Sequence, residues 1–309
     1  MKTHKRQSGS RSAGRGDNPR RNDGRGVERG REPSTIRDSE GHDAGAAPAF
    51  SDQIYGLVPV MEALRAGQRT IDSITVAEGA RHERLRDLIQ LAKEARVPVH
   101  RVPRISLERS AEQINHQGVI ARTAAARYRD PDELLDALAQ GVMTNQPPLV
   151  LGLDGVEDPR NFGAILRTAE CAGVNGVFIP ERRAVGLTDT VAKAAAGAVE
   201  YVPIARVTNL VRLIGQLKER NIWVVGAAAE ASADYTEWDW KLPSAIFLGS
   251  EGSGLHRLVR ERCDTLVHIP VLGHLESLNV SVVAGILLYE ALRQRKKSGA
   301  GAPADRGAG

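Results

Sequence analysis

The stretch Glu276-Ser277-Leu278-Asn279-Val280-Ser281 places short polar side chains at the start of a predicted terminal helix over residues 280–295. It interrupts a run of sequence that is otherwise apolar. Small polar side chains at a helix start can cap free backbone N–H groups, and they can also face a ligand. Their position therefore indicates a functional site at this end of the helix.

Two further junctions between a predicted strand and the following loop also carry polar groups. Phe247-Leu248-Gly249-Ser250-Glu251-Gly252-Ser253-Gly254-Leu255 places a carboxylate in a glycine-rich loop directly after an apolar strand. Asp158-Pro159-Arg160-Asn161-Phe162-Gly163 follows another predicted strand and precedes Arg167. One such loop alone would be weak evidence, but three at strand ends favour an enzyme.

In their order and spacing, these three stretches resemble the three motifs of the SpoU/TrmH family in the SPOUT superfamily. Members of that family methylate the ribose 2′-hydroxyl of RNA with S-adenosylmethionine. The resemblance covers residues 149–293. Upstream, the segment from Tyr55-Gly56 to His116-Gln117-Gly118-Val119 is similar to the RNA-binding domain of the family's large-subunit rRNA guanosine methylases. The resemblance thus implies a 23S rRNA guanosine 2′-O-methyltransferase with rRNA as its partner.

The pattern beyond Pro147-Pro148 predicts an α/β fold around a parallel sheet that is buried on both faces. Strands are expected at residues 149–154, 176–179, 201–203, 222–227, 245–249 and 265–269. Helices are expected at residues 162–172, 190–196, 210–220, 255–260 and 280–295. No Gly-x-Gly-x-x-Gly turn or Walker loop follows a strand, which disfavours NAD and ATP as ligands. The resemblance implies a deep trefoil knot, which general topology rules make very rare.

A smaller α/β domain is predicted before this one. Its expected helices lie at residues 58–66, 83–96 and 107–114, and its expected strands at residues 71–76, 97–102 and 119–125. The resemblance implies an L30/L7Ae-type fold for this domain. Two readings of His116-Gln117-Gly118 stay open, direct contact with RNA or only a turn into the last strand.

The predicted organisation has five parts: a disordered basic tail (1–48), an RNA substrate-binding domain (49–128), a linker (129–147), a SPOUT methyltransferase domain (148–295) and a disordered tail (296–309). The linker is expected to hold one helix at residues 132–139. Residues 1–48 carry eleven Lys or Arg against seven Asp or Glu and few aliphatic side chains. They cannot bury enough apolar surface to offset the entropy of ordering. Their Arg-Gly stretches predict either added attraction to phosphates or no more than a solubilising tail.

The composition of the chain limits its expected cellular location and the ligands it can bind. The chain has 309 residues, 41% of them hydrophobic, and a net charge of +4. No apolar stretch approaches the ~20 residues that span a bilayer, so no membrane partner and a cytoplasmic location are expected. Cys171 and Cys263 lack metal-ligand spacing and are predicted to be buried, unreactive thiols. The histidines show no paired metal spacing, and no metal is predicted.

Arg167 is the residue expected to activate the ribose hydroxyl, as the resemblance implies. A neutral alcohol is a poor nucleophile, so methyl transfer needs help with its proton. An ordinary arginine stays protonated, but a guanidinium can stabilise the developing alkoxide electrostatically. Whether Arg167 also takes the proton stays open. The alternative is a solvated side chain that forms an ion pair with Glu170 or Asp158.

The resemblance places Asn161, Glu251, Ser277 and Asn279 in the catalytic site beside that arginine. Asn161 is expected either to cap its helix, to join the site, or to do both. Glu251 is expected to organise backbone amides around the site or to approach the sulfonium, and its alternative is a plain loop glutamate.

The cofactor implied by the resemblance is S-adenosylmethionine, held by backbone atoms around Gly249, Ile269 and Leu278. Such recognition needs the shape of the loops more than their side chains. The alternative for Ile269 and Leu278 is a place in the core.

The sequence therefore predicts a homodimeric RNA ribose 2′-O-methyltransferase whose partner subunit completes each active site. Two alternatives stay open: a tRNA or other rRNA substrate, and a non-catalytic RNA-binding ribosome-assembly protein. The N-terminal domain weighs against tRNA, because the smaller tRNA-specific relatives typically lack it. The five polar motif residues weigh against an inactive protein.

Overall fold

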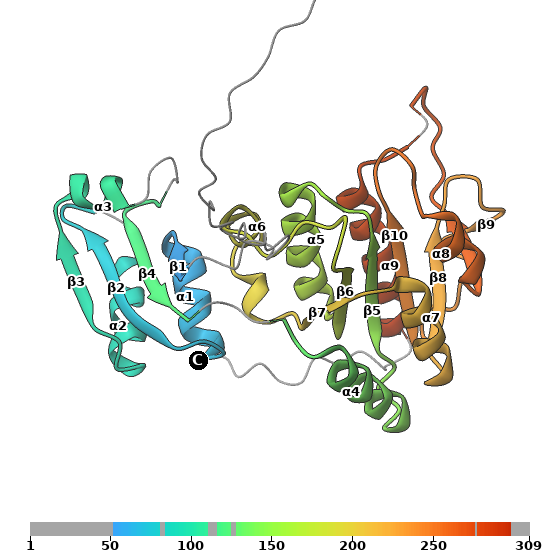
Figure 1. The fold of residues 1–309 in the computed structure, drawn as a ribbon, viewed down its shortest axis with the longest axis horizontal. Helices are drawn as coiled ribbons and strands as arrows, with labels where there is room; N and C mark the ends of the chain where they lie inside the picture. The colour runs from blue at the N-terminus through green and yellow to red at the C-terminus, as the bar shows by residue number, and fades with distance from the viewer. Residues whose placement is uncertain (1–51, 81–83, 111–115, 125–127, 276, 298–309) are drawn as a thin grey trace, which may run out of the picture. The chain divides into compact units, whose positions relative to one another are not determined.

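The structure is a computed structural model that describes residues 52–80, 84–110, 116–124, 128–275 and 277–297. These residues form two sheets, each with its own helices (Figure 1). Glu276 and the predicted tail at residues 1–48 lie outside the described residues. Of the predicted tail at residues 296–309, the first two residues belong to the last helix and the rest also lie outside.

The larger sheet has seven strands in the order β7-β6-β5-β10-β8-β11-β9, and its neighbouring strands pair in parallel. The strands are β5 (Leu149–Asp154), β6 (Gly176–Pro180), β7 (Ile204–Val207), β8 (Trp223–Ala227), β9 (Ala233–Asp234), β10 (Ser244–Gly249) and β11 (Thr265–His268). All six residues of β5 are buried, in keeping with a central strand covered on both faces. The predicted α/β fold with a parallel sheet is confirmed.

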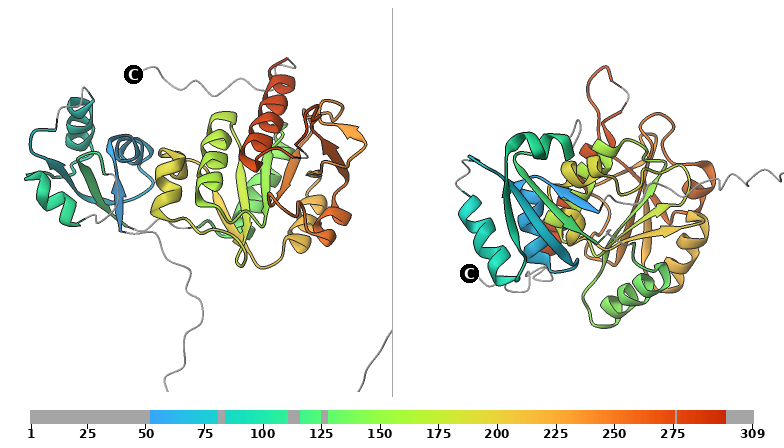
Figure 2. Two further views of the ribbon diagram at one scale, coloured as in Figure 1. Left: turned by 90° about the horizontal axis from the view of Figure 1, so that it is seen from above. Right: turned by 60° about the vertical axis from the view of Figure 1, so that its left-hand side comes forward.

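Helices cover both faces of this sheet (Figure 2). One layer consists of α5 (Pro159–Ala172), α6 (Asp189–Ala195) and α9 (Val280–Lys297). The other consists of α4 (Pro131–Met143), α7 (Leu210–Glu219) and α8 (Arg257–Arg262). Alternate residues of β5 contribute to the two cores, since Leu151 packs with the first layer and Val150 with the second. This alternation follows from the two-residue period of a strand.

One predicted strand in this part of the chain is misplaced, and one observed strand was not predicted. Residues 201–203 do not form a strand, because a 3₁₀ turn at Ala198–Glu200 precedes them and the strand begins only at Ile204. Pro203 has no N–H to donate to a ladder, although its carbonyl accepts from the Val177 N–H at 2.9 Å. The two-residue strand β9 has no counterpart among the predicted elements.

Helix α4 is longer than the helix predicted in the linker. Asp130 caps it by accepting from the N–H groups of Asp132 and Glu133 at 2.9 and 3.1 Å. Three buried leucines of α4 pack in the same cluster as sheet residues: Leu134, Leu135 and Leu138. By packing, the segment is part of the core around the larger sheet.

The smaller sheet has the order β1-β4-β2-β3, with β2 and β3 parallel and the other pairs antiparallel. Its elements are β1 (Gln53–Tyr55), α1 (Leu57–Ala66), β2 (Ile71–Ala77), α2 (Leu85–Glu94), β3 (Val99–Val102), α3 (Arg104–Ser110) and β4 (Val119–Thr123). Strand β1 was not predicted, and α3 begins three residues before the expected start at residue 107. The expected ends of that helix and of the last strand fall on residues 111–115 and 125–127, outside the described residues.

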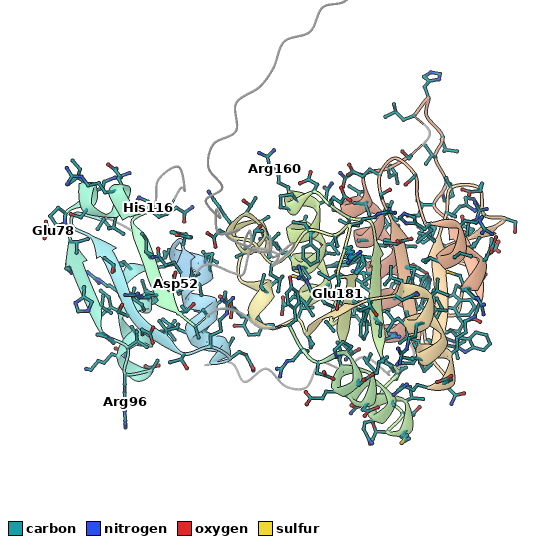
Figure 3. All side chains as sticks on the ribbon, viewed as in Figure 1. Asp52, Glu78, Arg96, His116, Arg160 and Glu181 are labelled. Atoms are coloured by element: carbon teal, nitrogen blue, oxygen red, sulfur yellow. The ribbon has the colours of Figure 1, made fainter. Side chains whose placement is uncertain are left out.

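His116-Gln117-Gly118 forms a tight turn into β4 (Figure 3). Gln117 and Gly118 have φ angles of 50° and 81°, and the Val119 N–H donates to the His116 carbonyl at 2.9 Å. The buried His116 ring accepts at Nδ1 from the Gly118 N–H at 3.0 Å. The turn is therefore confirmed, and contact with RNA stays a prediction.

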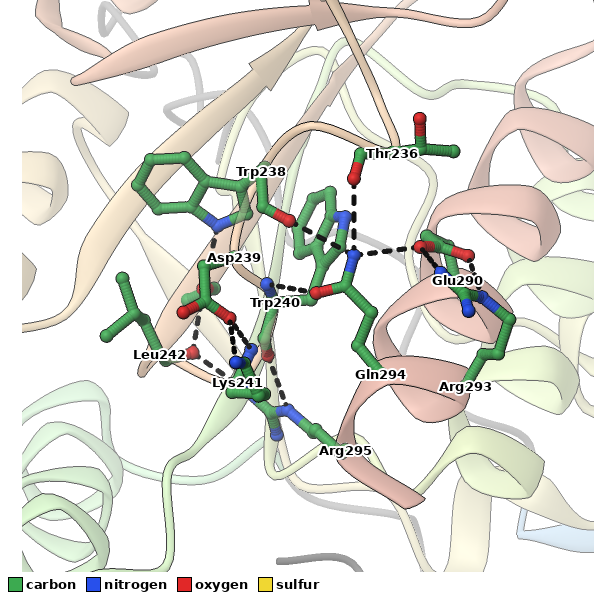
Figure 4. Close-up of polar contacts among 11 residues, drawn as sticks. Thr236, Trp238, Asp239, Trp240, Lys241, Leu242, Glu290, Arg293, Gln294 and Arg295 are labelled. Atoms are coloured by element: carbon green, nitrogen blue, oxygen red, sulfur yellow. Dashed lines mark hydrogen bonds and ion pairs between the residues drawn. The ribbon is translucent and has the colours of Figure 1, made fainter. Parts of the chain in front are cut away.

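The C-terminal end of α9 is fixed by backbone carbonyls (Figure 4). The Arg295 guanidinium donates to the carbonyls of four residues: Pro147, Pro148, Trp240 and Leu242. The neighbouring Gln294 amide accepts from the Trp240 N–H at 3.0 Å and donates to the Trp238 carbonyl at 3.1 Å. These bonds tie α9 to the start of β5 and to the segment before β10.

Candidate active site

Three side chains from distant parts of the sequence meet where β5 and β10 end. Asn161 Nδ2 donates to Glu251 Oε1 at 2.5 Å, and Asn279 Nδ2 donates to the same oxygen at 2.6 Å. Asn279 Nδ2 also lies 3.1 Å from Asn161 Oδ1. One residue from each of the three motifs thus joins a single hydrogen-bonded cluster, called the amide-carboxylate cluster below.

Asn161 is free to join this cluster because another residue caps its helix. The Asp158 side chain accepts from the Arg160 N–H at 2.7 Å, and Pro159 occupies the first helical position. Proline suits that position because its missing N–H would be unpaired there in any case. Capping by Asn161 is therefore wrong, since Asn161 lies inside the first turn of α5.

Asn279 combines the two roles that the sequence allowed for this stretch. Its Oδ1 accepts from the N–H and the hydroxyl of Ser281 at 2.9 and 2.6 Å, which satisfies donors at the start of α9. Its Nδ2 faces Glu251. Capping thus fixes the orientation of the amide that reaches the carboxylate.

Glu251 lies on the exposed tip of a closed loop. Ser250 and Gly254 exchange two backbone hydrogen bonds of 3.1 and 3.0 Å, and Gly254 has a φ of 63° that suits glycine. The Glu251 carboxylate accepts from side-chain amides, so the predicted bonds to backbone amides are not what the structure contains. Bonds to a charged acceptor are stronger than neutral ones, which favours a fixed arrangement of the three motifs.

Arg167 and Ser277 lie outside the amide-carboxylate cluster. Arg167 is six residues beyond Asn161 on α5, a rise of about 9 Å along the helix. Its exposed side chain forms no ion pair or hydrogen bond with any residue that the structure describes, so the expected alternative of a pair with Glu170 or Asp158 is wrong. A guanidinium without a protein partner is available to an external anion. Ser277 is also exposed.

A cavity of about 400 Å³ borders the cluster. The three residues expected to hold the cofactor, Gly249, Ile269 and Leu278, all line it, as do Glu251 and Ser277. Other parts of its wall come from residues 227–230, 250–255 and 267–268, with Arg260, Val271, Val280 and Val283. Its volume lies within the range of about 300–1,000 Å³ that is usual for small-molecule sites.

Gly249 has no room for a side chain. A Cβ atom at this position would lie 2.0 Å from the Gly254 carbonyl carbon and 2.2 Å from the Leu255 nitrogen. The loop after β10 folds back against the strand end, and only glycine permits this approach. The cavity wall is therefore backbone at this point, as backbone recognition of a ligand requires.

Sequence reasoning missed two polar pairs near this loop. Arg260 and Glu230 form an ion pair and both line the cavity. Asp154, at the end of β5, binds His256 through both carboxylate oxygens. A signal existed for Asp154, because it is a single charge at the end of an apolar strand. Nothing in the spacing of Glu230 or Arg260 pointed to the cavity.

The structure also bears on metals, membranes and thiols. Among the described residues, no group of three or more His, Cys, Asp or Glu could hold a metal ion. No helix in the described part of the chain has the length and apolar character to cross a membrane.

Cys171 is exposed, so the prediction of two buried thiols is wrong for it. Burial raises the pKa of the partly buried Cys263 to about 12.

Comparisons with known proteins give similarity along both parts of the chain. The SpoU rRNA Methylase family model matches residues 148–289, and the RNA 2′-O ribose methyltransferase substrate binding model matches residues 53–129. A protein of Bacillus subtilis named as a TrmH family tRNA/rRNA methyltransferase is 44% identical over 248 residues, which are 80% of this chain and 98% of that protein. The 23S rRNA (guanosine-2′-O-)-methyltransferase RlmB of Shewanella oneidensis is 44% identical over 245 residues, 79% of this chain and 98% of that protein.

Solved structures agree with these similarities. An RNA 2′-O ribose methyltransferase is 29% identical with a TM-score of 0.63, and the match covers 79% of this chain and 88% of that chain. An AdoMet-bound rRNA methyltransferase from Sinorhizobium meliloti is 27% identical with a TM-score of 0.62, and the match covers 78% of this chain and 86% of that chain.

Proposed function

Because this chain belongs to the SpoU/TrmH family of RNA 2′-O-ribose methyltransferases, we propose that it methylates the ribose of a guanosine in 23S rRNA. S-adenosylmethionine is its cofactor. The observation that carries the proposal is the amide-carboxylate cluster, which joins all three motifs at the rim of a cavity of ligand size. The choice of 23S rRNA is supported by the similarity to the Shewanella enzyme along both domains.

The proposed cofactor site is the cavity lined by Gly249, Ile269 and Leu278. Its glycine-rich wall suits a ligand recognised through backbone N–H and carbonyl groups, because no side chain intervenes at Gly249. When bound, S-adenosylmethionine supplies an activated methyl group on its sulfonium. The residues of the cluster hold the loops of the cavity in one arrangement and leave its rim open toward an RNA ribose.

Arg167 is proposed to act on the RNA. Its exposed guanidinium, which has no partner among the described residues, can bind a phosphate and stabilise the charge that develops on the 2′-oxygen as the methyl group is transferred. Arg160, at the start of α5, also extends into solvent (Figure 3) and would add attraction to phosphates. Both arginines lie on the helix that contributes Asn161.

The active protein is proposed to be a homodimer that pairs through the outer face of α9. Val282 and Tyr289 are 48% and 52% exposed, and the partly exposed Ile286 lies between them at helical spacing. This apolar stripe begins next to Asn279 and so adjoins the catalytic motif. A second copy seated there would bring its own residues close to the site.

The remaining features are proposed from family membership. These are the trefoil knot, the L30/L7Ae-like fold of the first domain and a cytoplasmic location. The domain bounds 49–128 and 148–295 are supported by the matches at residues 53–129 and 148–289. Residues 1–48 are proposed to be a basic tail and the segment after α9 a second tail, while the predicted linker at residues 129–147 contains α4, which packs in the core.

A transfer assay with radiolabelled S-adenosylmethionine tests the proposal. The purified full chain is mixed separately with unmodified 23S rRNA, 16S rRNA and total tRNA. We expect label in 23S rRNA only, at a guanosine ribose. Label in tRNA or 16S rRNA would assign another substrate, and failure to bind S-adenosylmethionine at all would favour a non-catalytic RNA-binding protein.

A further inference from the structure

Asp154 is a buried carboxylate outside the amide-carboxylate cluster. Asp154 is the last residue of the central strand β5, and only 5% of its surface is exposed. A buried carboxylate is costly unless hydrogen bonds or charges compensate for lost water. The other five residues of β5 are apolar or glycine, so this charge needs a local reason.

Both oxygens of Asp154 bind one residue. The His256 backbone N–H donates to Oδ2 at 2.7 Å, and His256 Nδ1 lies 2.9 Å from Oδ1. His256 is the residue directly before α8. The pair therefore joins the end of one strand to the start of a helix 102 residues later.

Asp154 lies beside both ends of the loop that bears Glu251. The loop leaves the sheet at Gly249, which pairs in register with Asp154, and it returns at His256, which Asp154 binds. Gly155, with a φ of 80°, brings the same turn close to the loop, since a Cβ atom there would lie 3.5 Å from Ser250 Cβ.

We propose that Asp154 and His256 are a positioning pair that fixes this loop for cofactor binding. The inference rests on the proposed function, because residues 249–255 line the proposed cofactor cavity and carry Glu251. Neither Asp154 nor His256 lines the cavity. The pair thus acts through the loop backbone, and the His256 side chain, 48% exposed, stays in contact with water.

Two variants of the full-length protein separate the two bonds. Asp154→Ala removes both, and we expect the Kd for S-adenosylmethionine, measured by calorimetry, to rise about tenfold or more. His256→Ala keeps the backbone bond, so its Kd should rise only about threefold. The double variant should be no worse than Asp154→Ala, because residues that act as one unit are not additive.

The conservative variant Asp154→Asn tests whether an amide can replace the carboxylate in fixing the loop. In Asp154→Asn the amide oxygen can accept from the His256 N–H while the amide nitrogen donates to Nδ1. We expect this variant to bind the cofactor within about threefold of wild type. A lower methyl-transfer kcat of Asp154→Ala at saturating cofactor would further support displacement of the loop that carries Glu251.

Asp264 is the matched control. It also accepts a backbone N–H, that of Val224 at 2.8 Å, and pairs with Lys218 at 2.7 Å, but it lies at the amino-terminal edge of the same sheet. Asp264→Ala should lower the melting temperature and leave the Kd unchanged. The inference is overturned if folded Asp154→Ala and His256→Ala bind like wild type, or if Asp264→Ala weakens binding equally. Failure of wild type to bind would instead refute the proposed function.

Discussion

A single carboxylate oxygen of Glu251 accepts hydrogen bonds from two asparagines that are 118 residues apart in the sequence. The resemblance placed five residues in one catalytic site, and three of them, Asn161, Glu251 and Asn279, are joined by hydrogen bonds in the structure. It did not predict their partners. Asp158 and Asn161 are equally good caps by residue type, and only the start of the helix at Pro159 decides between them.

Arg167→Ala should abolish methyl transfer while the Kd for S-adenosylmethionine stays within about threefold of wild type, because the guanidinium is proposed to contact RNA. Arg167→Lys should be nearly as poor, since a point charge cannot reproduce bidentate binding of a phosphate. Single-turnover methylation of 23S rRNA measures the first quantity and calorimetry the second. Near-normal turnover of the alanine variant would eliminate Arg167 as the activating group.

Gly249→Val should weaken cofactor binding more than Ser277→Ala does. A side chain at Gly249 would collide with the backbone of Gly254 and Leu255, whereas Ser277 loses only an exposed hydroxyl at the cavity wall. Calorimetry measures the cofactor Kd of each variant, after circular dichroism has shown that the variant is folded. Unimpaired binding by Gly249→Val would place the cofactor elsewhere.

Among the elements, α9 does most to connect the fold with the site. Its first turn is capped by Asn279, its buried face packs in the core, and its last turn is held by Arg295 and Gln294 (Figure 4). Periodicity predicted the helix to within two residues of its end. The role of Arg295 could not be predicted, because its partners are backbone carbonyls that any sequence would provide.

Arg295→Met should lower the free energy of unfolding by about 2 kcal/mol, because four carbonyls lose a charged donor in a partly buried setting. Arg257→Met is the control, since Arg257 pairs with Glu261 of the same helix and both side chains are exposed, and it should change stability little. Urea denaturation followed by circular dichroism measures both. Equal losses would show that the carbonyl contacts of Arg295 have no special weight.

For the whole molecule, the alternation of apolar strands with helices was enough to predict a parallel α/β sheet. The ends of the strands were harder to predict from the sequence. A strand was expected at residues 201–203, but a 3₁₀ turn and a proline precede the observed strand, which begins three residues later at Ile204. The α4 leucines were read as part of a polar linker, since their burial depends on a sheet whose position the local pattern does not contain.

Tyr289→Glu should convert the proposed dimer to a monomer and abolish methyl transfer, because it puts a charge on the apolar stripe of α9. Leu258→Glu introduces the same charge at a similarly exposed position on α8, in the other helical layer, and should leave the dimer intact. Analytical ultracentrifugation gives the mass of each. A dimeric and active Tyr289→Glu variant would move the interface elsewhere.

We propose that this protein methylates the ribose of a 23S rRNA guanosine at the amide-carboxylate cluster. The most direct measurement maps ribose 2′-O-methylation across total RNA from cells with and without the protein, and after complementation. We predict loss of one methylated guanosine in 23S rRNA, restored by wild type and not by Arg167→Ala. An unchanged 23S rRNA map, or a methylation lost from tRNA instead, would contradict the proposed 23S rRNA substrate.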